Sequence, residues 1–205
     1  MKIGVIGTGS VGSALGTAWS KHGHEVFYGM RDPKKAPPSG GTHVKQGTVA
    51  QAARFADVVV LATPWAATEA AVKACGDLSG KVVIDCTNPL AADLSGLVIG
   101  THDSAGESVA RWAVDARVVK CFNTLGAQNF ATPFFRDQIA SMFLCGNDAE
   151  AKEIVEKLGE DLGFEMIDVG PLTQSRLLEP LALLWISLAY KSDFGPNIAF
   201  KLLRR

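Results

Sequence analysis

Three glycines near the N-terminus have the spacing of a phosphate-binding turn. They lie in Gly7-Thr8-Gly9-Ser10-Val11-Gly12, between an apolar run at residues 2–6 and a helical pattern at residues 10–21. The first glycine permits the tight bend, the second lets the backbone approach a pyrophosphate, and the third lets helix and strand pack closely. The start of the helix supplies unpaired N–H groups and a positive dipole end. The complete strand–turn–helix context disfavours the alternative, an ordinary glycine turn.

The end of the second predicted strand bears on the choice between NAD and NADP. A chain that binds NAD usually places Asp or Glu there, where it binds the ribose 2′-hydroxyl. Here Gly29 and Met30 precede Arg31, whose guanidinium can hold a 2′-phosphate through two parallel charged hydrogen bonds. Asp32 leaves alternatives open, because it could pair with Arg31 or lean toward a ribose, and Arg31 could be a solvated surface residue. The pattern favours NADP, with NAD possible.

Two further turns follow predicted strands, at the edge where ligands of open α/β sheets bind. Thr63, Pro64 and Trp65 come directly after the apolar run at residues 58–62. Thr63 could hydrogen-bond the cofactor, and Trp65 could form a wall beside the nicotinamide. Asn88 follows the run at residues 82–85 and is a candidate partner for the nicotinamide amide or ribose. In the alternatives, Trp65 only packs on the following helix and Asn88 only forms a turn.

No side chain stands out as a catalytic acid, and we leave the catalytic residues unassigned. Lys120 ends a predicted strand, and we expect a structural or surface role for it. His22 and His24 flank a glycine at the end of the first helix, where they suit the cap and the dipole. His102 could act as a proton donor or metal ligand, but we predict no metal site. Hydride transfer to a flavin-like ring mainly requires two rings held face to face, so positioning can supply much of the catalysis.

The elements that must position these residues follow from the apolar pattern. Short Val- and Ile-rich runs alternate with helical patterns, as expected of βαβ units around a parallel sheet. Strands are predicted at residues 2–6, 25–29, 58–62, 82–85, 118–121, 141–145 and 164–168, and helices at 10–21, 48–55, 66–74, 104–113, 149–162 and 173–190. We predict an α/β fold: a doubly wound, mostly parallel Rossmann-type sheet with a C-terminal apolar helix. We expect one NADP-binding domain over residues 1–205, with an extension from about residue 164 as lid or dimer interface.

Composition limits the partners. With 20% charged residues and a formal net charge of −1, we expect no nucleic acid or membrane partner and instead a small-molecule acceptor. The four scattered cysteines and the absence of a leader pattern predict a cytoplasmic protein. The helix at residues 173–190 is apolar nearly all round, which predicts a homodimer. The breaker-rich segment at residues 33–41 is predicted to be a mobile surface loop.

Taken together, the chain resembles the NADP-dependent deazaflavin (coenzyme F420) oxidoreductases and the related cytosolic domain of six-transmembrane ferric reductases, over nearly its whole length. The resemblance rests on the glycine turn and on Met30-Arg31, Thr63-Pro64-Trp65, Thr87-Asn88-Pro89-Leu90, Val119-Lys120-Cys121-Phe122-Asn123-Thr124, Cys145-Gly146-Asn147-Asp148, Gly170-Pro171-Leu172 and Ser175-Arg176-Leu177-Leu178-Glu179. It implies that Arg31, with help from Lys35, binds the adenosine 2′-phosphate and that the loop from Thr8 to Val11 binds the pyrophosphate. Family members often carry Ser where this chain has Met30, which removes one hydroxyl donor to the phosphate.

Three functional hypotheses follow. The first is an NADP(H)-dependent oxidoreductase that transfers a hydride between nicotinamide and a flavin-like or other small acceptor, with deazaflavin or flavin as the possible co-substrate. The second is a non-catalytic dinucleotide-binding sensor or regulatory module, because the turn reports binding and not turnover. The third is a small imine or carbonyl reductase, which would more often need a positioned proton donor.

Overall fold

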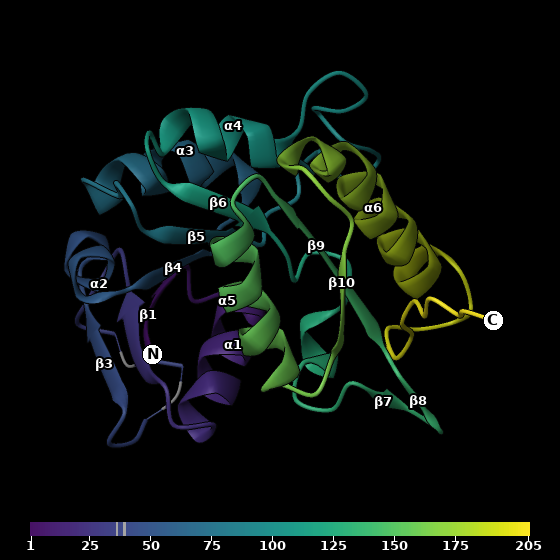
Figure 1. The fold of residues 1–205 in the computed structure, drawn as a ribbon, viewed down its shortest axis with the longest axis horizontal. Helices are drawn as coiled ribbons and strands as arrows, with labels where there is room; N and C mark the ends of the chain where they lie inside the picture. The colour runs from purple at the N-terminus through teal and green to yellow at the C-terminus, as the bar shows by residue number, and fades with distance from the viewer. Residues whose placement is uncertain (36, 39) are drawn as a thin grey trace.

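A single large sheet with helices on both faces organises the chain (Figure 1). The computed structural model describes residues 1–35, 37–38 and 40–205. Its elements are β1 (Lys2–Ile6), α1 (Ser10–Lys21), β2 (Glu25–Gly29), β3 (Val44–Gly47), α2 (Val49–Phe55), β4 (Val58–Leu61), α3 (Trp65–Cys75), β5 (Val82–Asp85), α4 (Ala105–Trp112), β6 (Arg117–Lys120), η1 (Ala127–Asn129), β7 (Phe134–Phe135), β8 (Gln138–Ile139), β9 (Ser141–Gly146), α5 (Ala149–Glu160), β10 (Glu165–Asp168), η2 (Leu172–Gln174) and α6 (Ser175–Lys191).

The strand order is that of a doubly wound sheet. It runs β10-β9-β6-β5-β4-β1-β2-β3, and the strands from β3 to β6 are all parallel to one another. β9 runs antiparallel to β6, and β10 is parallel to β9. The chain reverses its direction of winding between β1 and β4, so a crevice for ligands is expected at their carboxyl ends. The predicted fold class is therefore confirmed.

Two layers of helices bury the two faces of the sheet. Along β4, Val58 and Val60 join one core with side chains of α1 and α5, whereas Val59 and Leu61 join the other core. This second core is completed by α2, α3, α4 and the start of α6. The alternation follows from the pleat of a strand, and burial on both sides explains why the parallel strands are almost continuously apolar.

The helix starts are specified locally. Thr48 and Gln51 form a reciprocal capping box at α2, and the Ser104 and Asp148 side chains accept N–H groups at the starts of α4 and α5. The ends of these three helices lie within two residues of the predicted ends.

Three features were not predicted. The edge strand β3 was missed because only Val44 among its residues is strongly apolar. The β7–β8 hairpin is too short to leave a periodic pattern, and the antiparallel direction of β9 depends on pairing between distant segments. The predicted mobile loop at residues 33–41 includes Ala36 and Ser39, which lie outside the described residues. Within the described part of the chain, none of the helices combines the length and the apolar character needed to cross a membrane.

Candidate functional site

The glycine turn is held tightly on one side and open on the other. Gly7 has a φ of +101°, and a Cβ there would collide with the backbone of Ala62 at the end of β4. The Ser13 hydroxyl donates to the Thr8 carbonyl at 2.9 Å, which ties α1 to the turn. At Gly9, the residue before α1, a Cβ would have no heavy atom within 4 Å. The backbone is therefore exposed where a pyrophosphate would have to approach.

Arg31 lies at the same edge of the sheet. Gly29, at the end of β2, is paired with Ile6, which directly precedes the glycine turn. Arg31 is exposed and forms no ion pair with any described residue. Asp32 instead accepts the backbone N–H of Lys34 at 3.2 Å in a local turn, so the weighed Arg31–Asp32 pair does not form. The guanidinium, with exposed Lys35 nearby in sequence, is available to an anion.

A cavity of about 240 Å³ lies beside the turn, at the carboxyl ends of β1, β5 and β6. We call it the ring cavity. The described residues that line it are Ser10, Val11, Cys86, Asn88, Phe122, Asn123, Leu125, Gly126, Ala127, Gln128, Ala182, Trp185, Ile186 and Tyr190. They come from the turn, from the loops after β5 and β6, and from α6. The C-terminal helix thus forms one wall of the candidate site.

Two asparagines from the loops after β5 and β6 line the ring cavity and are paired with each other. The Asn88 amide nitrogen donates to the Asn123 backbone carbonyl at 3.1 Å, and the Asn123 amide nitrogen donates to Asn88 Oδ1 at 2.9 Å. Asn123 also donates to the Leu178 carbonyl of α6 at 3.2 Å. Its own Oδ1 is buried and has no hydrogen-bond partner among the described residues. An unpaired buried acceptor costs roughly 1–3 kcal/mol, so this oxygen requires an explanation.

Phe122, the residue before Asn123, has an unusual backbone conformation. Its φ is +58°, in the left-handed region that bulky residues rarely adopt. Such a conformation costs about 1–3 kcal/mol and persists only where the surroundings fix it. Here the ring is fully buried and makes edge contacts with Trp19 and Phe130, with centroids 5.6 and 6.2 Å apart. The core thereby fixes the turn that brings Asn123 to the cavity.

Behind the asparagines lies a buried charged cluster of Asp85, Lys120 and Glu179. The Lys120 ammonium donates to Asp85 Oδ2 at 2.9 Å, to the Thr87 carbonyl at 2.6 Å and to Glu179 Oε1 at 2.8 Å. Asp85 Oδ1 accepts both the N–H and the hydroxyl of Thr87. All three charged side chains are inaccessible to solvent. The arrangement supports the structural role expected for Lys120.

Glu179 also joins two helices. Its carboxylate accepts the N–H groups of Ala105 and Gly106, which begin α4, at 3.0 and 3.1 Å. A carboxylate suits the positive end of that helix. Burial raises the pKa of Glu179, and the positive charge of Lys120 opposes this shift.

The predicted turn at Thr63, Pro64 and Trp65 does not line the ring cavity. The Thr63 hydroxyl is 2.9 Å from that of Thr68, and the Trp65 ring stacks on Trp112 of α4 with centroids 5.4 Å apart. Pro64 is exposed at the start of α3. These contacts favour the packing alternative for Trp65, while contact of Thr63, Pro64 or Trp65 with a cofactor stays a prediction.

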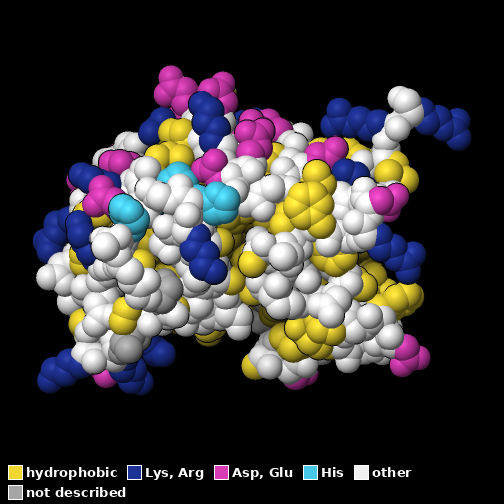
Figure 2. Space-filling model, turned by 90° about the horizontal axis from the view of Figure 1, so that it is seen from below, with side chains coloured by type: hydrophobic (Ala, Val, Ile, Leu, Met, Phe, Trp, Pro, Cys, Tyr) yellow, Lys and Arg dark blue, Asp and Glu magenta, His cyan; other side chains and the backbone are white. Residues whose placement is uncertain are grey.

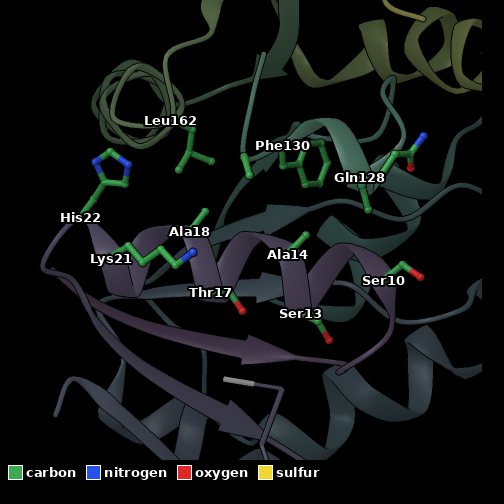
Figure 3. A pocket seen from close by; sticks show the side chains of 12 residues that line it. Ser10, Ser13, Ala14, Thr17, Ala18, Lys21, His22, Gln128, Phe130 and Leu162 are labelled. Carbon is green, nitrogen blue, oxygen red and sulfur yellow. The ribbon is translucent and has the colours of Figure 1, made fainter. Parts of the chain in front are cut away.

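A larger groove of about 600 Å³ runs along α1 (Figure 3). The described residues that line this α1 groove are Ser10, Ser13, Ala14, Thr17, Ala18, Lys21, His22, Ala127, Gln128, Phe130, Ala131 and Leu162. Lys21 and His22 lie at one end and Ser10 at the other, with Phe130 and Leu162 across from the helix (Figure 3). Ser10, Ala127 and Gln128 line both cavities, so the α1 groove borders the ring cavity.

Sequence reasoning identified Asn88 but missed Asn123, Asp85 and Glu179 as members of the site. Asn123 follows β6 as Asn88 follows β5, so the argument used for Asn88 could have found it. The charged cluster left no signal, because its three members are far apart in sequence and each is common on protein surfaces.

Known proteins of similar sequence and structure identify the family of this chain. Residues 2–89 match the family described as NADP oxidoreductase coenzyme F420-dependent. The crystal structure of a candidate F420-dependent NADP-reductase from Arthrobacter sp. FB24 is 37% identical, with a TM-score of 0.91 and 100% of both chains covered. The crystal structure of the hypothetical protein SMa0349 from Sinorhizobium meliloti is 27% identical, with a TM-score of 0.77 over 100% of this chain and 96% of that one.

A curated relative is longer. Metalloreductase STEAP3 of Rattus norvegicus is 27% identical over 183 residues, which are 89% of this chain and 36% of that protein. The chain therefore spans little more than a third of that relative's length. The full-length match to the Arthrobacter protein agrees with the fold, and the family match covers the glycine turn. The chain belongs to the family of coenzyme F420-dependent NADP oxidoreductases.

Proposed function

We propose that the chain binds NADP(H) across the carboxyl ends of β1 and β4 and transfers a hydride between nicotinamide and a flavin-like small acceptor, either a deazaflavin or a flavin. The observation that carries the proposal is the ring cavity, which lies directly beside the open glycine turn. When bound, the dinucleotide would supply or take up the hydride. The protein's part is to bind, orient and shield the reacting rings.

The dinucleotide-binding part of the proposal assigns each end of the cofactor to its own residues. Arg31, with help from Lys35, would hold the 2′-phosphate, because its guanidinium is exposed and unpaired among the described residues. The N–H groups at the start of α1 would hold the pyrophosphate over Gly9, where no heavy atom lies within 4 Å of a Cβ position. Thr63, Pro64 and Trp65 remain proposed contacts at the adjoining strand end.

The lining of the ring cavity bears on the type of acceptor. Its described residues include no Asp, Glu, His or Lys, and burial raises the pKa of the Cys86 thiol well above its usual value. Tyr190, exposed at the end of α6, is the one phenol among them. A flavin-like ring requires positioning more than a proton donor, whereas an imine or carbonyl reductase usually requires both. The lining therefore favours the flavin-like acceptor.

The α1 groove offers a place for the rest of such an acceptor. It borders the ring cavity, carries the hydroxyls of Ser13 and Thr17, and ends near Lys21 and His22. A flavin nucleotide has a polyol chain that ends in phosphate, and this chain matches hydroxyls followed by a cation. We propose that the ring enters beside the nicotinamide and that the polar chain lies along α1.

The proposed function is tested by anaerobic NADPH oxidation with coenzyme F420, flavin mononucleotide, side-chain-free lumiflavin, a cyclic imine and a small ketone. We expect F420 or the flavin nucleotide to be reduced, with a higher KM for lumiflavin because it lacks the polar chain. Reduction of the imine or ketone alone, lost in Tyr190→Phe, would favour the imine or carbonyl reductase. Tight NADPH binding with no acceptor reduced would favour the non-catalytic sensor.

A further inference from the structure

Asn123 lines the ring cavity, and its buried side-chain oxygen has no hydrogen-bond partner among the described residues. The residue is only 6% exposed. The Asn123 nitrogen donates to two acceptors, Asn88 Oδ1 and the Leu178 carbonyl. Rotating the amide by half a turn would place the Asn123 oxygen against these two acceptors and would lose both hydrogen bonds. The contacts therefore fix the orientation that leaves the oxygen unpaired.

Asn88 has unused hydrogen-bonding capacity next to this oxygen. A side-chain amide has two N–H donors and an oxygen with two lone pairs. One donor of Asn88 is used on the Asn123 backbone, and one lone pair accepts from the Asn123 nitrogen. Asn88 is half-buried and lines the ring cavity, so a second N–H remains for a ligand. A free donor and an unpaired acceptor thus occur side by side in one wall.

A primary carboxamide matches this donor and acceptor, because its carbonyl oxygen can accept a hydrogen bond and its NH2 group, bonded to the same carbon, can donate one. We propose that Asn88 and Asn123 together bind the carboxamide of the nicotinamide ring, an inference that rests on the proposed function. Asn88 donates to the carboxamide oxygen, and Asn123 Oδ1 accepts a carboxamide N–H. Because Asn123 Oδ1 is buried, this contact requires the side chains that cover the oxygen to move as the carboxamide enters.

The charged cluster acts as the scaffold of this pair. Asp85 and Lys120 together hold Thr87, the residue before Asn88, through the bonds to its N–H, hydroxyl and carbonyl. Lys120 precedes Asn123 by three residues, and Glu179 follows the Leu178 carbonyl that accepts from Asn123. Each segment that carries the amide pair is therefore anchored to the same buried ammonium. Lys120 is accordingly a positioning residue for nicotinamide binding.

The test compares two dinucleotides on the full chain by isothermal titration. One is NADP⁺, and the other is its 3-acetylpyridine analogue, which keeps the carbonyl oxygen but replaces the amide nitrogen by a methyl group. We expect the unmodified chain to bind NADP⁺ about tenfold more tightly, the effect of one buried hydrogen bond. In Asn123→Ala the two affinities should become nearly equal. In Asn88→Ala both ligands should weaken, because both have the carbonyl that Asn88 contacts.

Asn147→Ala is the matched control, since Asn147 accepts the Leu172 N–H and lines neither cavity. It should keep the tenfold preference. Equal affinities in the unmodified chain, or an unchanged ratio in a folded Asn123→Ala, would overturn the inference; the first result does not depend on any variant folding. If the unmodified chain bound neither dinucleotide, the result would instead contradict the proposed function.

Discussion

The ammonium of Lys120 lies 2.8 Å from Oε1 of Glu179, and neither side chain reaches solvent. Asp85, on the other side of the ammonium, is equally buried. Burial alone would lower the pKa of Lys120, but the charges of Asp85 and Glu179 outweigh it and raise that pKa above its usual value. Lys120 therefore compensates the negative charges of both carboxylates inside the protein, and its removal leaves them uncompensated.

Lys120→Met should lower the free energy of unfolding by about 3–5 kcal/mol at neutral pH, because two buried carboxylates lose their counter-charge. The pKa of Glu179 is already raised by burial and should rise further without Lys120. A carboxyl whose pKa is raised in the folded state binds protons more tightly there than in the unfolded chain. The deficit of the variant should therefore shrink as the pH falls toward the ordinary Glu pKa of about 4.3.

Urea denaturation of both proteins across acidic and neutral pH measures this deficit. The control is Lys152→Met, which breaks the exposed Lys152–Asp168 ion pair at 2.7 Å and should cost less than about 1 kcal/mol. A Lys120→Met loss as small as the control's, or one that does not change with pH, would show that the cluster does not carry the buried charges described here.

Arg31→Ala should weaken NADPH binding by more than about tenfold while changing NADH binding little, since only NADPH carries the 2′-phosphate. Fluorescence titration of both cofactors gives the two affinities. Arg54→Ala, at an exposed arginine on α2, is the control and should change neither. An equal loss for both cofactors would remove Arg31 from its proposed place at the phosphate.

Gly9→Val should abolish binding of both cofactors and leave the fold intact. The structure leaves open space where the branched side chain would lie, and the φ of −74° at Gly9 suits any residue. The added methyl groups would occupy the place of the pyrophosphate. Gly100→Val, at another open glycine, is the control for the substitution itself. Circular dichroism checks folding, and near-native affinity in a folded Gly9→Val would contradict the role of the turn.

The sheet and the glycine turn could be predicted because their signals are local. The apolar run at residues 2–6 and the glycine spacing that follows it are contiguous, and the structure places β1 and α1 there. The identity of Lys120 as an interior residue could not be predicted, because nothing within its own segment shows that Asp85 and Glu179 are its partners. The same reason hid the unpaired oxygen of Asn123, whose environment depends on Leu178 in α6.

For the C-terminal helix too, some features could be predicted from the sequence and others could not. The apolar helix predicted at residues 173–190 is present as α6, on which Leu177 and Leu184 are 65% and 49% exposed. Trp185 of this helix is not available to a partner surface, because its side chain is 4% exposed and donates to the Ile198 carbonyl at 2.8 Å. The segment after α6 therefore covers part of this helix at Trp185. Figure 2 shows hydrophobic side chains on both halves of this face of the molecule, with the larger patches on the right.

We therefore predict a homodimer through the face of α6 that carries Leu177, Leu181 and Leu184, whose spacing places them on one side of the helix. Leu184→Glu should dissociate it, because a carboxylate would be buried against apolar side chains. Light scattering at micromolar concentration gives the mass of both proteins. Leu94→Glu, at an exposed leucine in a loop, should leave the dimer unchanged. A monomeric unmodified chain would refute the predicted assembly.

Deuterium transfer shows whether a hydride passes from nicotinamide to a flavin-like ring. The full chain is incubated anaerobically with coenzyme F420 and with NADPH deuterated at one or the other face of C4, and the products are analysed by mass spectrometry. One of the two labelled cofactors should deliver its deuterium to the reduced deazaflavin, since the ring cavity would hold nicotinamide with a single face toward the acceptor. Reduced deazaflavin without deuterium from either cofactor, or no reduction despite NADPH binding, would rule out direct hydride transfer from nicotinamide to this ring.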